Sequence, residues 1–151
     1  MAALPAEFPR PERREMWTIL QLHYGNPAIH FELQPQLSRS SVELGLHFES
    51  SVEVNDAWAA AVADRADELF PELGPEWELE AWTASWRRLH RTYRFERLTA
   101  ELGRQVAGDL ASVLQLLGPM VSGSPLAAAS AAPARPERHG RQPRARRHAR
   151  R

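Results

Sequence analysis

The chain has 151 residues, of which 43% are hydrophobic and 25% are charged, as in an ordinary soluble globular protein of one domain. It contains no cysteine, which excludes disulfides, thiolate metal sites and cysteine nucleophiles, and all 19 basic residues are arginine, which excludes a catalytic or phosphate-binding lysine. The net charge of zero hides a division, because residues 1–118 hold 11 arginines against 18 acidic residues and residues 119–151 hold eight arginines against one glutamate.

The N-terminal region is not expected to be a secretory signal. Residues 1–14 are proline-rich with little periodicity, which predicts a flexible arm, and they lack the apolar segment and cleavage site of a secretory signal. No apolar run approaches the roughly 20 residues that span a bilayer. We therefore expect a cytoplasmic protein that does not contact a membrane.

Three runs in the first third of the chain alternate apolar and polar side chains with period two, as half-buried strands do. They cover residues 16–24, 29–34 and 42–49. The turn signal Gly25-Asn26-Pro27 separates the first two runs. The three runs together predict an antiparallel meander.

The second half of the domain mixes helical and strand patterns. An apolar stripe at helical spacing predicts a helix over residues 55–69. Residues 76–83 alternate as a strand; residues 86–93 also fit a helix face, but their Trp, Tyr and Thr content favours a strand. A final apolar stripe predicts a helix that Thr99 caps and Gly118-Pro119 ends.

The resulting order, β-β-β-α-β-β-α, predicts an α+β fold. Two amphipathic helices require a sheet to cover, so we expect an antiparallel sheet of about five strands with both helices on one face. Residues 15–118 form this single domain. Residues 119–151 are Ala/Pro/Arg-rich with few large apolar side chains, which predicts a disordered basic tail.

Histidines and glutamates recur on the polar side of the predicted meander. With a short turn after the first strand, His23 lies opposite His30; with Leu33 opposite Val42, Glu32 lies opposite Glu43. Imidazole and carboxylate are good ligands for zinc, manganese or iron. The candidate metal ligands are His23, His30, Glu32, Glu43 and His47. Alternation alone also produces such a group, so we expect the solvent-facing side of a sheet that has no cofactor, with a divalent metal as the alternative.

The layout of an acidic hairpin beside helices is similar to that of restriction-endonuclease-like nucleases, which bind magnesium. Glu32, Glu43 and Glu49 could supply carboxylates. That family's motif normally ends in a lysine, which this chain lacks. No catalytic role is therefore carried over from the resemblance.

A second group of side chains suits binding. Tryptophan and arginine are enriched in binding hot spots, and the candidate binding face consists of Trp82, Trp86, Arg88 and His90. The charge of −7 on residues 1–118 argues against nucleic acid at this face. The alternative is that both tryptophans belong to the core.

Three interpretations of the basic tail are open, two with a function and one without. Its arginines could bind nucleic acid weakly and without sequence preference, or fold back on the acidic domain. The extension could also have no role. The candidate nucleic-acid-binding arginines are Arg141, Arg144, Arg146, Arg147, Arg150 and Arg151.

No complete catalytic motif is present in the sequence. The sequence therefore favours a small non-enzymatic domain that binds a protein partner or itself. The alternatives are a metal-dependent hydrolase or nuclease that uses the His/Glu group, and nucleic-acid binding through the tail alone.

Overall fold

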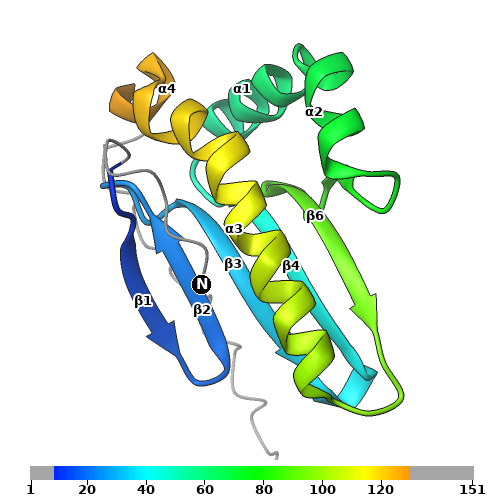
Figure 1. The fold of residues 1–151 in the computed structure, drawn as a ribbon. Coiled ribbons are helices and arrows are strands. Elements are labelled where there is room, and N and C mark those ends of the chain that lie inside the picture. The colour runs from blue at the N-terminus through cyan, green and yellow to red at the C-terminus, as the bar shows by residue number, and fades with distance from the viewer. Residues whose placement is uncertain (1–8, 130–151) are drawn as a thin grey trace, which may run out of the picture.

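The computed structural model describes residues 9–129 as an antiparallel sheet with helices on one face (Figure 1). The strands are β1 (Glu12–Met16), β2 (Ile19–His23), β3 (Ile29–Gln36), β4 (Ser41–Phe48), β5 (Glu78–Ala81) and β6 (Arg87–Arg94). They lie in the order β1-β2-β3-β4-β6-β5 across the sheet. The helices are α1 (Val52–Ala63), α2 (Ala66–Leu73), α3 (Ala100–Gly123) and α4 (Pro125–Ala129), with a short 3-10 helix at Leu37–Arg39. The predicted α+β class is confirmed, with six strands in place of about five.

The additional strand, β1, lies mostly before the first predicted run of residues 16–24. β1 pairs with β2 through a two-residue turn at Trp17 and Thr18. Trp17 adopts a positive φ of 55° and is fully exposed. Residues 12–14, expected in the flexible arm, are therefore part of the sheet, while residues 1–8 lie outside the described residues.

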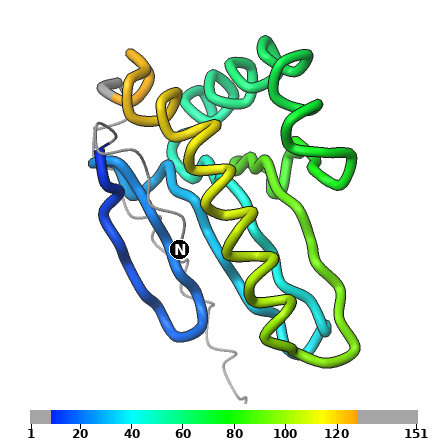
Figure 2. Tube along the Cα trace, in the orientation of Figure 1, coloured from blue at the N-terminus to red at the C-terminus, as the bar shows by residue number. Residues whose placement is uncertain are grey.

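The core lies between the sheet and the helices. Alternate residues of β3 and β4 point to the helical side, where Phe48 stacks on Trp58 of α1 with ring centroids 5.9 Å apart. The chain trace shows α3 crossing the middle strands (Figure 2). At its middle, Tyr93 of β6 donates a hydrogen bond of 2.6 Å to Asp109 of α3. The largest fully buried apolar side chains are Trp58, Phe31, Phe48, Leu44, Leu46, Leu69, Leu89 and Leu117.

Prolines end fewer helices than the sequence predicted. The expected helix over 55–69 is two helices, α1 and α2, and Pro71 lies inside α2. Pro119 likewise lies inside α3, which continues to Gly123 and is followed by α4, so the tail does not begin at residue 119. A proline inside a helix costs about 3 kcal/mol. Burial of Val121 and packing of Leu126 against the core offset this cost.

Helix α3 is long and apolar. By length and composition alone it could cross a membrane, a property that core helices of soluble proteins share. Of its most apolar 18-residue window, only 33% is buried. Helix α3 therefore carries apolar surface that the described part of the chain leaves uncovered.

Both edges of the sheet are short. β1 has five residues, four of them charged, and β5 has four residues, two of them glutamates. In the ribbon, β1 and β2 lie to one side of α3, and no described helix passes in front of them (Figure 1). The helical layer is thus incomplete over this half of the sheet.

Candidate functional site

A row of polar side chains crosses the face of the sheet opposite the helices. Its members come from β2, β3, β4 and β6, and they are buried although no helix in residues 9–129 covers them. The buried polar residues of this face are Gln21, His23, His30, Glu32, Glu43, His47 and His90. The expectation of a solvated sheet surface is therefore wrong for these residues. His30 contacts Gln21 and Glu32, and His47 contacts His30, Glu43 and Trp82.

The first predicted hairpin register is correct and the second is wrong. His23 pairs with His30 as expected. Leu33, however, pairs with Leu44 in place of Val42, so His30 faces His47 and Glu32 faces Gly45. A shift of two residues preserves the side of the sheet on which each side chain lies. It exchanges the expected Glu32–Glu43 pair for a pair of histidines whose ring centroids are 5.5 Å apart.

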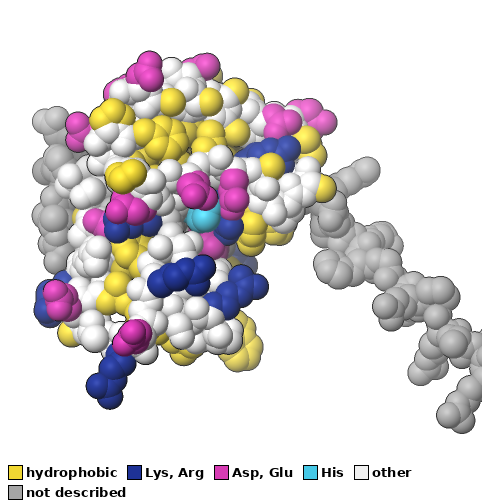
Figure 3. Space-filling view, turned by 90° about the vertical axis from the view of Figure 1, so that its right-hand side faces the viewer, with side chains coloured by type: hydrophobic (Ala, Val, Ile, Leu, Met, Phe, Trp, Pro, Cys, Tyr) yellow, Lys and Arg dark blue, Asp and Glu magenta, His cyan; other side chains and the backbone are white. Residues whose placement is uncertain are grey.

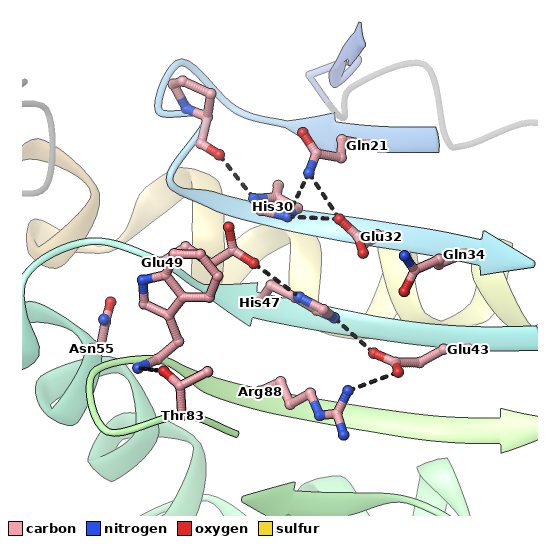
Figure 4. A network of polar contacts seen from close by, with 12 residues as sticks. Gln21, His30, Glu32, Gln34, Glu43, His47, Glu49, Asn55, Thr83 and Arg88 are labelled. Carbon is pink, nitrogen blue, oxygen red and sulfur yellow. Dashed lines mark hydrogen bonds and ion pairs between the residues drawn. The ribbon is translucent and has the colours of Figure 1, made fainter. Parts of the chain in front are cut away.

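His30 is fixed at both ring nitrogens (Figure 4). Its Nδ1 lies 2.8 Å from the carbonyl oxygen of Pro27, which can only accept, so Nδ1 carries a proton. The amide nitrogen of Gln21 lies 3.0 Å from His30 Nε2 and 2.8 Å from Glu32 Oε2. Since an amide nitrogen can only donate, Nε2 of His30 is an acceptor here. One amide thus bridges an imidazole and a carboxylate.

His47 lies between two carboxylates. Its Nε2 is 3.1 Å from Glu43 Oε1 and its Nδ1 is 3.3 Å from Glu49 Oε1. Burial disfavours the charged ring, but the hydrogen bonds with Glu43 and Glu49 outweigh burial and raise the pKa of His47 to about 9. Burial opposes ionisation of Glu32, but its contacts with His30 and Gln21 outweigh burial and lower the pKa of this carboxyl group.

Arg88 of β6 links this row to the edge strand. Its guanidinium donates to Glu43 and to Glu80, each at 2.7 Å. His90 Nε2 lies 2.9 Å from Glu80 Oε1, close enough for an ion pair but not aligned as a hydrogen bond. Burial and the charge of Arg88 lower the pKa of His90. Seen from the β6 side, acidic and basic side chains gather around a histidine (Figure 3).

The two tryptophans of the predicted binding face are not core residues. Trp82 is 38% exposed and Trp86 is 36% exposed. The ring of Trp82 packs edge-on against His47 at 5.3 Å, with the Arg88 guanidinium 4.9 Å from its centroid. The four predicted residues do lie on one side of the sheet, but Arg88 and His90 are engaged in the polar row and offer little free surface.

Two groups of side chains in residues 9–129 have the chemistry and spacing to hold a metal ion. In the first, ligand atoms of His30, Glu32 and His47 all lie within 4.8 Å of one another. Two further predicted ligands, His23 and Glu43, are not in that group, and Glu43 is bound to Arg88. The second group consists of Glu78, Glu80 and His90. Sequence reasoning missed it, although Glu78 and Glu80 alternate along a predicted strand.

An apolar groove lies on the opposite, helical side of the sheet. It encloses about 530 Å³ between α3 and the half of the sheet that α3 leaves uncovered. The groove is lined by Arg13, Leu20, Leu22, Leu33, Pro35, Val42, Leu98, Thr99, Leu102, Gly103, Val106, Ala107, Leu110, Ala111 and Leu114. Arg13 is the one charged residue in this lining. Sequence reasoning missed the groove, because periodicity identifies apolar faces and not which of them remain uncovered.

The tail arginines, Arg141 to Arg151, lie outside the described residues. The sequence matches no protein-family model and no curated protein. Among solved structures, it is similar to "YbjN, a putative transcription regulator from E. coli", at 13% identity and a TM-score of 0.37, over 73% of this chain and 83% of that one. A likeness at this level carries no conclusion about function.

Proposed function

We propose that this protein is a non-enzymatic binding module whose apolar groove takes an amphipathic helix of a protein partner. The groove between α3 and the β1–β2–β3 half of the sheet carries the proposal. Neighbouring strands are about 4.8 Å apart, so three strands present a strip about as wide as a helix, roughly 10 Å. One added helix, parallel to α3, would complete the helical layer.

The wall of the groove supports a helical occupant. Gly103, Ala107 and Ala111 follow one another at four-residue spacing along α3 and all line the groove. Small side chains at this spacing let a second helix approach closely. Arg13 on the rim is paired with the exposed Glu15, and an acidic residue on the partner helix would complement it. This mode of recognition is helix-in-groove binding.

The proposal is tested by placing a photo-cross-linking amino acid at Ala107 in the full chain, with Gln105 as the matched position. Ala107 lines the groove, whereas Gln105 is exposed on α3 outside it. We expect position 107, but not position 105, to cross-link to an apolar helical segment of another protein. A synthetic peptide of that segment should bind the purified protein, and Ala107→Glu should abolish binding.

Other cross-links would contradict this proposal. A product with residues 1–8 of the same chain would mean that the protein fills its own groove. A product with a second copy would mean self-association in place of a separate partner. The absence of any product specific to position 107 would also count against a helical occupant.

A further inference from the structure

The row of polar side chains on the other face of the sheet brings several carboxylates together in mostly buried positions. Glu32, Glu43 and Glu49 approach two imidazoles, and Arg88 is the one guanidinium bound to them within the described residues. Buried carboxylates are costly unless they are paired or coordinate metals. The surplus of negative charge is therefore suited to a cation.

The two facing histidines are oriented as metal ligands are. His30 Nδ1 donates to the carbonyl oxygen of Pro27, and His47 Nδ1 contacts the carboxylate of Glu49. A metal-binding histidine usually holds its second ring nitrogen in this way, against a carbonyl or a carboxylate. In both rings the other nitrogen, Nε2, is directed to a glutamate on the same strand.

The amide of Gln21 marks the point where acceptor atoms converge. Its nitrogen lies 3.0 Å from His30 Nε2 and 2.8 Å from Glu32 Oε2, so both atoms direct lone pairs at one position. A cation in the same place would satisfy both acceptors after the amide turns away. Ligand atoms of His30, Glu32 and His47 lie within 4.8 Å of one another, and small side-chain rotations would close them on one ion.

We propose that His30, Glu32 and His47 bind a divalent transition-metal ion of the zinc class. Two imidazoles and one carboxylate are a ligand set for such ions that leaves a coordination position open. A polar hollow of about 610 Å³ is lined in part by Glu43 and Trp82, and both of these side chains contact His47. This site is independent of the apolar groove, which lies on the other face of the sheet.

The test is calorimetric titration of the full chain with Zn²⁺ alone. His139 and His148 are replaced by alanine throughout, so that tail histidines do not contribute. We expect one ion per chain, with affinity falling by about tenfold or more in Glu32→Gln and in His30→Gln, because even the loss of a group that only orients a ligand costs about 10–100-fold. His23→Gln is the matched control, since His23 faces His30 but lies outside the cluster, and its affinity should not change.

Gln21→Ala keeps the proposal testable if a ligand variant does not fold. Removing the competing amide should leave Zn²⁺ affinity unchanged or increase it, whereas a purely structural hydrogen-bond network would only lose stability. Failure to bind Zn²⁺ would overturn the proposal. Binding that survives His30→Gln but is lost in His90→Gln would also overturn it, and would place the ion at Glu78, Glu80 and His90.

Discussion

Nε2 of His47 lies 3.1 Å from Oε1 of Glu43, and both side chains are almost completely buried. This contact favours the charged form of each partner. The pKa of His47 is raised to about 9. Burial opposes ionisation of Glu43, but the hydrogen bond from His47 and the charge of Arg88 outweigh burial and lower its pKa.

The raised pKa of His47 predicts a loss of stability in mild alkali. An unfolded histidine titrates near 6.5, so the stabilisation is complete below that pH and disappears as the pH rises through about 9. The free energy of unfolding should fall by roughly 3 kcal/mol across this interval. Chemical denaturation at a series of pH values, with a chelator present, measures the fall.

His47→Gln is the control for this prediction, because its stability should be flat between pH 6.5 and 9. His90 does not interfere, since its pKa is lowered and it affects stability only below pH 6.5. The lowered pKa of Glu43 predicts a separate loss as the pH falls below 4.5. A wild-type curve without any decline above pH 6.5 would contradict the proposed charge on His47.

A second prediction concerns Gly45 at the middle of β4. A Cβ atom there would lie 2.8 Å from Cβ of His90 and 3.0 Å from the carbonyl oxygen of Leu89. Neither atom is the end of a flexible side chain, so the strands would have to separate. Gly45→Ala should lower the free energy of unfolding by about 1–3 kcal/mol, measured by urea denaturation.

Gly108→Ala provides the opposite result for the same chemical change. Gly108 lies inside α3 with open space around its would-be Cβ. Because glycine is about 0.5–1 kcal/mol worse than alanine inside a helix, this substitution should stabilise the protein by about that amount. Equal effects at the two positions would show that β4 and β6 are not as close as described.

A third prediction concerns Asn55, which is fully buried at the start of α1. Its side chain accepts from the backbone N–H of Ser50 and donates to the carbonyl oxygens of Ser50 and Ser85. Asn55→Ala leaves these groups without their partner, and each unsatisfied buried group costs about 1–3 kcal/mol. Thermal and urea unfolding should show a loss of about 2 kcal/mol or more.

The neighbouring Asp56→Ala is the matched control. Asp56 forms an exposed ion pair of 2.9 Å with Arg87, and such pairs contribute about 0–1 kcal/mol. The hydrogen bonds of Asn55 indicate that it joins α1 to the loop before β6. A similar loss of stability in the two variants would contradict this role.

The sequence predicted the fold class because its strongest signals were periodic. Alternation located β3 and β4, and the apolar stripe located α3. β1 was missed because its sequence, ERREM, is charged along most of its length and the Trp17–Thr18 turn lacks the usual glycine or asparagine. Local patterns also could not show that α3 continues beyond Pro119, because this continuation depends on packing against the core.

The candidate site could be predicted in composition but not in geometry. Alternation placed His30, Glu32 and His47 on one side of the sheet, and this holds under any even shift of register. Their pairing depends on the conformation of the β3–β4 turn, where Ser40 adopts a positive φ of 47°. Since Ser40 is not a glycine, this conformation could not be predicted from the residue type. Trp82, which packs against His47, comes from a loop distant in sequence, so this contact could not be predicted either.

The two edge strands limit how copies of this chain can join. An open sheet edge is a template for adding a strand from another molecule, which leads to aggregation. β1 presents four charged side chains in five residues, and β5 is only four residues long. Both features disfavour continuous sheets across molecules. Copies of this chain are therefore not expected to join edge to edge, although apolar surface beside α3 stays uncovered within residues 9–129.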